Sequence, residues 1–167
     1  LGGQPDSVAV APDNAFVAIA IENERDEDLG DGRTGQLPGG FLVMVGLTED
    51  GVLDCETLSS VDLAGLADVS PEDPEPEYVS INGLGETVVT LQENNHLVVV
   101  SRDGTVLSHF SAGAVDLDNI DATDERAALI FDESQPGRVR EPDAVTWIDD
   151  THFATANEGD MDGGSRG

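Results

Sequence analysis

The repeating unit of this chain is clearest in EPEYVSINGLGETVVTLQENN, residues 75–95. A proline followed by an acid opens an alternating apolar stretch, and the stretch closes on Glu93 with two asparagines after it. The same order recurs at both ends of the chain: QPDSV (4–8) leads to IAIENE (19–24), and EPDAV (141–145) leads to TANEGD (155–160). Self-similarity of this kind is typical of a repeated sheet module.

The spacing within each repeat predicts a β-hairpin. The carboxylate after the proline lies 16, 16 and 15 residues before its glutamate, which suits two short strands and a tight turn. The expected hairpins pair residues 8–10 with 16–21, 79–81 with 87–91, and 145–148 with 152–156. Because a hairpin returns to the edge where it began, the Pro-acid pairs and the closing glutamates should meet on one face.

Composition and repeat together predict an all-β fold. Only 4% of residues are aromatic, while 19 glycines and 8 prolines favour many short strands. Four-stranded antiparallel units in series are typical of a β-propeller. We expect blades at residues 1–67 and 78–110, an acidic connector at 111–140, and the first half of a third blade at 141–167. About two and a half blades cannot close a ring, so a fragment of a larger propeller is expected; a β-sandwich is the alternative.

The charge balance narrows the classes of partner. Seven arginines, no lysine and 35 acidic residues give a net charge of -28, which disfavours nucleic acid and anionic membrane surfaces, and no segment is apolar enough for membrane insertion. Either high external salt screens the carboxylates or bound cations neutralise them. The absence of lysine favours a halophilic or marine extracellular origin over a bias of a GC-rich genome. The single cysteine, Cys55, excludes an internal disulfide and is expected to be buried.

The hairpins should gather one ring of acids at the rim of the propeller channel. Crowded carboxylates raise each other's pKa, and Ca²⁺, which accepts six to eight oxygen ligands, relieves the repulsion. Asn23, Asn94 and Asn95 would add neutral oxygens. Local capping of turns and direct acid-base catalysis are the alternatives. The predicted metal ligands of the rim are Asp6, Glu22, Glu77, Glu93, Asp143 and Glu158.

Two further groups of residues extend the candidate site. Two acidic loops alternate oxygen donors as calcium loops do, so several ions are expected, although a solvated acidic loop is the alternative and neither loop matches the EF-hand spacing. Arginines beside the rim motifs could contact a phosphate. No nucleophile motif is present, so catalytic residues stay unknown, and the three histidines are expected to be structural. The loop acids are Asp26, Asp28, Asp31, Asp160 and Asp162; the arginines are Arg25, Arg140 and Arg166.

The residues of all three repeats carry a family resemblance. The runs 71–79 and 89–95, the run 140–145 with 155–160, and the opening 4–8 resemble the secreted propellers of the choice-of-anchor I family, some of which are labelled as alkaline phosphatases or grouped near phytase-like esterases. The chain departs from the family at 124–127, where a Lys-Asp-Gly turn is usual. The resemblance implies an extracellular or cell-envelope protein, calcium as cofactor, and phosphoester chemistry.

Three functions remain open at this point. The first is a secreted calcium-dependent phosphoester hydrolase of the alkaline phosphatase or phytase-like kind, completed by the remaining blades of the same or an associated chain. The second is a non-catalytic surface propeller that calcium only rigidifies. The third is a lactonase-like propeller with one metal in its channel. The first predicts ions bridged by rim carboxylates with an open position, and the second predicts ions enclosed by protein oxygens.

Overall fold

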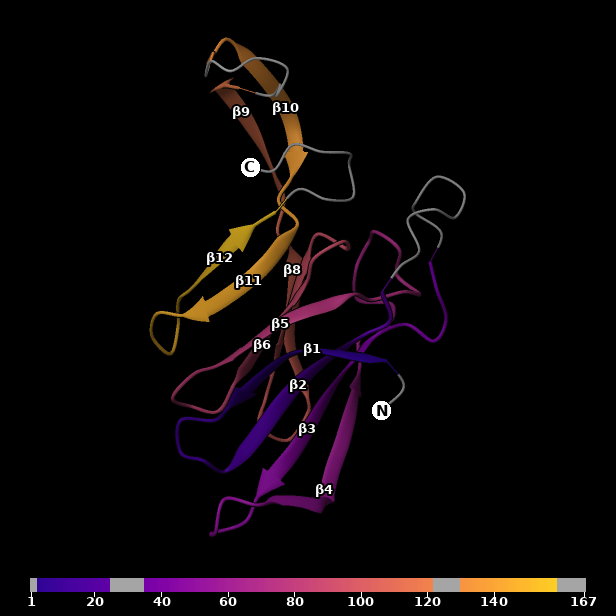
Figure 1. Ribbon diagram of the computed structural model, residues 1–167, viewed down its shortest axis with the longest axis vertical. Coiled ribbons are helices and arrows are strands. Elements are labelled where there is room, and N and C mark those ends of the chain that lie inside the picture. The colour runs from indigo at the N-terminus through magenta and orange to yellow at the C-terminus, as the bar shows by residue number, and fades with distance from the viewer. Residues whose placement is uncertain (1–2, 25–34, 122–129, 159–167) are drawn as a thin grey trace.

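The computed structural model describes residues 3–24, 35–121 and 130–158. These residues form twelve β-strands, and no helix occurs among them (Figure 1). Within the described ranges there is accordingly no helix that could cross a membrane. The expectation of an all-β chain is therefore confirmed.

The first sheet is antiparallel and follows chain order. It comprises β1 (Gln4–Val10), β2 (Phe16–Glu22), β3 (Phe41–Leu47) and β4 (Leu53–Asp62). The β1–β2 turn closes because Asn14 adopts a left-handed conformation with φ of 57° and the Asp13 carboxylate accepts a hydrogen bond from the Ala15 amide at 3.1 Å. The hairpin returns the end of β2 to the start of β1, with Gln4 opposite Glu22.

The second sheet repeats this plan, and a third begins it. The second contains β5 (Pro76–Ile81), β6 (Thr87–Leu91), β7 (His96–Val100) and β8 (Val106–Ser111), again antiparallel in chain order. In the third, β11 (Pro142–Trp147) pairs with β12 (Phe153–Asn157). The three sheets correspond to two four-stranded blades and the first two strands of a third.

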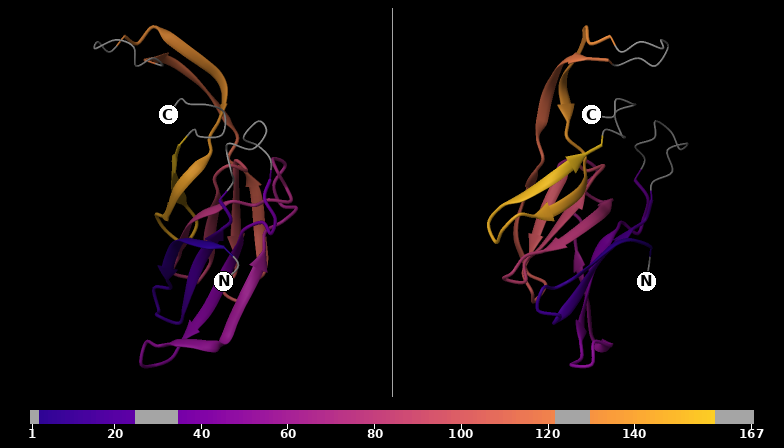
Figure 2. Two further views of the ribbon diagram at one scale, coloured as in Figure 1. Left: turned by 45° about the vertical axis from the view of Figure 1, so that its right-hand side comes forward. Right: turned by 60° about the vertical axis from the view of Figure 1, so that its left-hand side comes forward.

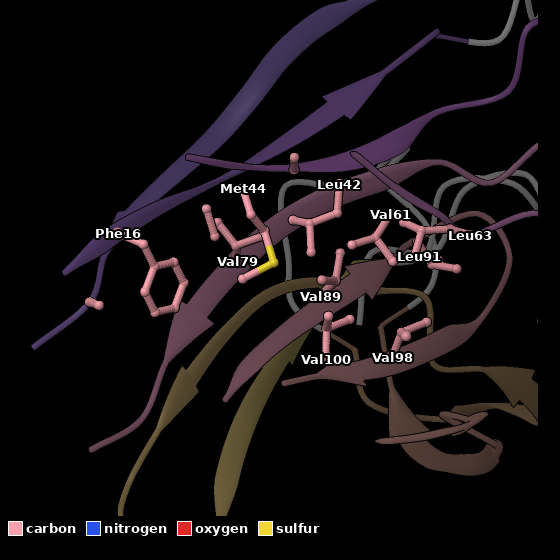
Figure 3. Packing of buried hydrophobic residues seen from close by; sticks show 13 residues of the cluster. Phe16, Leu42, Met44, Val61, Leu63, Val79, Val89, Leu91, Val98 and Val100 are labelled. Carbon is pink, nitrogen blue, oxygen red and sulfur yellow. The ribbon is translucent and has the colours of Figure 1, made fainter. Parts of the chain in front are cut away.

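The sheets stack face to face through apolar side chains. Ala18, Ala20, Leu42 and Met44 of the first sheet, together with Val89 and other residues of the second, form the larger core (Figure 3). Alternate residues of β6 and β7 point the other way and pack against β11 and β12. The second blade thus buries both faces of its central strands, β6 and β7, as the propeller arrangement requires.

Serine side chains also tie together the first strands of neighbouring blades. The Ser7 hydroxyl accepts a hydrogen bond from the Val79 amide, and the Ser80 hydroxyl accepts one from the Trp147 amide, both at 3.2 Å. The Trp147 indole donates to the Ser80 carbonyl at 3.0 Å. As a result β1, β5 and β11 lie side by side along the inside of the stack, so residues at the same position in each repeat become neighbours.

One segment needs a fuller description than the sequence allowed, and one expectation needs correction. The segment expected as a connector, 111–140, contains a hairpin of β9 (Ala114–Ile120) and β10 (Glu133–Val139), which extends away from the packed sheets in every view (Figure 2). Its few apolar residues alternate with acids, and this pattern is compatible with a strand that is exposed to solvent. Cys55 is exposed rather than buried, because it lies on the outermost strand β4, whose residues nearly all face solvent.

Candidate metal centre

The acid of each Pro-acid pair lies at a β-bulge. The register of β1 against β2 shifts between Pro5 and Ser7, so Asp6 is the extra residue. The register of β11 shifts in the same way around Asp143, and that of β5 shifts between Pro76 and Val79. A bulge interrupts the pairing and redirects a side chain. All three first strands therefore aim an acid away from the ladder at the same level.

Three carboxylates from two blades meet at this level. Asp6, Glu22 and Glu77 each place one carboxylate oxygen within 4.8 Å of those of the other two. Asp6 and Glu22 come from the two strands of the first hairpin, and Glu77 comes from the bulge of the next blade. Glu22 is 6% exposed, Glu77 is partly buried, and Asp6 is exposed. The cluster therefore has a buried base and a side open to solvent.

Burial and mutual repulsion raise the pKa values in this cluster. Burial, as the largest cause, and the adjacent Asp6 and Glu22 carboxyls together raise the pKa of Glu77 to about 10. The pKa of Glu22 is also raised, first by burial and then by the charges of Asp6 and Glu24, although contacts with Glu77 and Glu75 partly oppose the rise. At neutral pH the cluster without a cation therefore retains a proton.

Acids of the third blade also interact electrostatically with the cluster. Burial raises the pKa of Asp143, and the charges of Glu158 and Asp6 raise it further. The Glu158 amide donates to the Glu141 carbonyl at 3.0 Å, which closes the third repeat. Of the six rim acids predicted from the sequence, five thus interact with at least one other. Glu93 lies in the turn 92–95 with one carboxylate oxygen buried.

Sequence reasoning missed the acids that precede the prolines. Glu75 is 0% exposed and Glu141 is 1% exposed. Glu75 contacts the Glu22 carboxyl, so it belongs to the base of the cluster. The signal was visible, because the second and third repeats carry an acid on both sides of the proline. The first repeat has Gln4 at this position, so an acid before the proline is not common to all three repeats.

The three asparagines predicted as ligands differ in the hydrogen bonds that their side chains make. The Asn94 side chain accepts a hydrogen bond from the Glu75 amide at 2.8 Å and donates to the carbonyls of Val69, Ser70 and Asp73. Its oxygen is thus engaged with the backbone of a distant segment and not with its own turn, which is the contact that the capping alternative describes. In contrast, the Asn95 side-chain oxygen is buried without a hydrogen bond in the described part of the chain. Asn23 donates to the Pro38 carbonyl, which leaves its oxygen for other contacts.

Of the remaining predicted residues, Arg140 falls within the described ranges. The Arg140 guanidinium donates to the Ala112 carbonyl at 2.8 Å, so a described backbone contact accounts for its position. Seven of the predicted residues fall outside the described ranges, and their roles in binding metal or phosphate stay predictions: Arg25, Asp26, Asp28, Asp31, Asp160, Asp162 and Arg166.

Two solved structures are similar to this chain at low sequence identity. Hydrazine synthase from Kuenenia stuttgartiensis is 10% identical, with a TM-score of 0.51 over 92% of this chain and 45% of that chain. A catalytically inactive virginiamycin B lyase from Staphylococcus aureus, with quinupristin, is 12% identical, with a TM-score of 0.38 over 93% of this chain and 49% of that chain. This chain spans less than half the length of either structure. No curated protein sequence matches it.

A sequence model of the choice-of-anchor I domain matches residues 1–164. The match includes all three Pro-acid repeats and every strand described above. This chain therefore belongs to the choice-of-anchor I domain family.

Proposed function

We propose that this chain is the part of a propeller that binds calcium at its acidic rim, and that the bound metal serves phosphoester hydrolysis. Membership of the choice-of-anchor I domain family indicates a cell-surface or secreted protein. The observation that carries the proposal is the meeting of Asp6, Glu22 and Glu77, whose oxygens lie within 4.8 Å of one another. Remaining blades, from the same or an associated chain, would complete the rim.

The donor set suits a hard divalent cation. Ca²⁺ binds carboxylate oxygens at about 2.3–2.6 Å, so two ligands on opposite sides of one ion are about 5 Å apart. Three carboxylates within that span can share one ion with little movement. A cation would also replace the proton that the raised pKa of Glu77 retains. Calcium loops at 26–31 and 160–162 remain part of the proposal.

The open side of the cluster supports a catalytic role over a purely structural one. Asp6 is exposed, so an ion held from below by Glu22 and Glu77 would keep coordination positions for water or a ligand. A phosphomonoester approaching a chain of net charge -28 needs a metal to bridge its oxygens to the carboxylates. Arginine contacts from Arg25, Arg140 or Arg166 would support that bridge.

A calcium titration tests the binding step. We would compare the chain with E77Q and with E49Q, a matched change at an exposed turn residue of the first blade. Calcium should raise the Tm of the parent and of E49Q, and raise that of E77Q much less. An equal rise in all three proteins would reject the rim as the binding site.

A parallel assay tests the catalytic step. Hydrolysis of p-nitrophenyl phosphate by the parent should require calcium, stop with chelator, and be lost in E77Q but not in E49Q. Stabilisation without turnover would leave the alternative, a calcium-stiffened surface propeller. That alternative draws on the same cluster, because an ion shared by Asp6 and Glu77 would cross-link the first two blades.

A further inference from the structure

A pair of histidines on the second blade lies apart from the acidic rim cluster. The His96 Nε2 and the His109 Nδ1 are 3.1 Å apart. His96 begins β7 and is 4% exposed, whereas His109 lies on β8 and is exposed. The register places His109 opposite Val98, two residues beyond His96, so both rings stand on the same face of the sheet.

From this geometry we propose that His96 and His109 form a binding site for a divalent transition-metal ion, Zn²⁺ or Cu²⁺, that is separate from the calcium site. Imidazole nitrogen is a preferred ligand of these ions and a poor one for calcium. The proposal does not depend on the proposed function, because none of its ligands belongs to the acidic rim.

The separation of the two nitrogens suits a shared metal. With metal–nitrogen bonds of about 2.0–2.1 Å, nitrogens 3.1 Å apart subtend an angle of about 100° at the ion. That angle lies between the values for square-planar and tetrahedral coordination. The exposed His109 ring can turn to direct its lone pair at the ion, and the ion takes the place of the proton shared by the rings. That proton moves, by way of solvent, to the other nitrogen of the same ring, so both rings stay neutral when they bind the ion and no net proton is released.

A negative charge that acts on the pair would partly offset the charge of the ion. Asp68 lies in the linker between the first two sheets, and its charge acts on His96. The linker is held there because the Asn94 amide group donates to the Val69 carbonyl at 3.0 Å. Burial and the nearby His109 lower the pKa of His96, and Asp68 opposes them. The buried ring is therefore neutral near pH 7, the form that ligates metals.

Copper titration with electron paramagnetic resonance tests the site directly. The chain contains three histidines in all, so nitrogen coupling to Cu²⁺ reports on few side chains. The experiment uses C55S protein, which removes the exposed thiol, and saturating calcium, which occupies carboxylate sites. We expect coupling to two nitrogens, retained in H152Q and lost in H109Q, and Zn²⁺ affinity at least about tenfold weaker in H109Q.

The controls distinguish this proposal from the calcium site. H109Q changes an exposed residue and should leave the fold and calcium stabilisation unchanged, and E77Q should leave the two-nitrogen signal unchanged. Coupling to oxygen ligands alone in the parent, or a two-nitrogen signal that persists in H109Q, would overturn the proposal. D68N should weaken Zn²⁺ binding while preserving the two-nitrogen signal, and an unchanged affinity would remove Asp68 from the site.

Discussion

Glu77 combines a bulge position with burial and two acidic neighbours. Its raised pKa, about 10 against an ordinary 4.5, means that the folded chain holds a proton that the unfolded chain has lost. Because the folded state binds the extra proton between these values, its stabilising contribution is present below pH 4.5 and is lost as the pH rises towards 10. The residue therefore makes the fold sensitive to alkali when calcium is absent.

The stability of the calcium-free chain should therefore depend on pH. In calcium-free buffer the free energy of unfolding should fall between about pH 5 and about pH 9, as urea denaturation would measure. E77Q cannot lose the proton and should show a much smaller fall, while E49Q should keep that of the parent. A parent whose stability rises over this interval would contradict the assigned protonation.

Asn94 offers a second prediction at this scale. Its side chain makes four hydrogen bonds to backbone groups of the linker, and the residue is buried. N94A leaves these groups without their partner and should lower the free energy of unfolding by about 3 kcal/mol. N157A, at an exposed strand end, should cost less than about 0.5 kcal/mol. Similar losses in the two variants would show that the linker is not held by Asn94.

Individual residues also show which features of the site could be predicted from the sequence and which could not. The acids could be gathered from the sequence because tight turns such as 82–85 fix the return of each hairpin. The bulges could not be predicted, since each lies at the very start of its strand, before an alternating pattern is established. Cys55 was assigned to the core because cysteine is usually buried, and only the sheet order shows that β4 is outermost.

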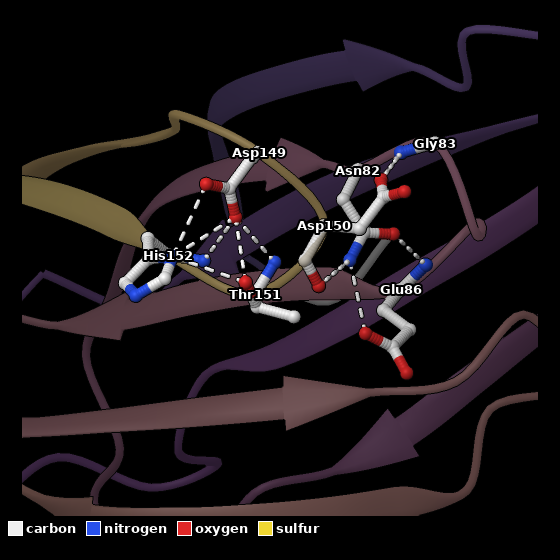
Figure 4. A network of polar contacts seen from close by, with 7 residues as sticks. All are labelled: Asn82, Gly83, Glu86, Asp149, Asp150, Thr151 and His152. Atoms are coloured by element: carbon white, nitrogen blue, oxygen red, sulfur yellow. Dashed lines mark hydrogen bonds and ion pairs between the residues drawn. The ribbon is translucent and has the colours of Figure 1, made fainter.

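Among the elements, the β11–β12 hairpin depends most on its neighbour. Its turn contacts the second blade through Asp150, whose carboxylate accepts a hydrogen bond from the Gly83 amide at 2.8 Å (Figure 4). Asn82 donates to the Asp150 carbonyl, and Asp149 closes the turn by accepting from the Thr151 and His152 amides. Two strands alone are marginally stable in water, so this contact matters for the whole hairpin.

D150A should therefore loosen the third blade without unfolding the first two. Hydrogen exchange of the β11 and β12 amides should speed up by about fivefold, which corresponds to the loss of one hydrogen bond of about 1 kcal/mol. The amides of β2 and β3 should exchange as in the parent, and E49A serves as the matched turn variant. Faster exchange throughout the chain would instead indicate that Asp150 supports the entire fold.

The β9–β10 hairpin is an element that the sequence pattern does not predict. Val115 and Leu117 alternate with acids, and the many acids of residues 111–140 predict a charged connector. The hairpin instead closes through local contacts, such as that of the Gly137 amide with the Asp116 carboxylate at 2.7 Å. An element that contributes little to a core gives little signal in the sequence.

For the whole molecule, the net charge of -28 dominates behaviour in dilute buffer. Screening should raise the Tm as NaCl increases from about 0.05 M to about 1 M, because the Debye length falls from above 10 Å to about 3 Å. Millimolar calcium should raise it more than NaCl or MgCl₂ of equal ionic strength, since Mg²⁺ demands a tighter octahedral site. Equal effects of the three salts would reduce calcium to a screening ion.

The bulges at Asp6 and Asp143 have a consequence for how this module can diversify. Each bulge releases its acid from the in-and-out alternation that governs the rest of the strand. A substitution there alters neither the parity of the strand nor any side chain of the two cores. The metal-binding residues can thus change independently of the residues that pack the sheets. A designer could replace the donors of the rim one position at a time without altering the packing between the sheets.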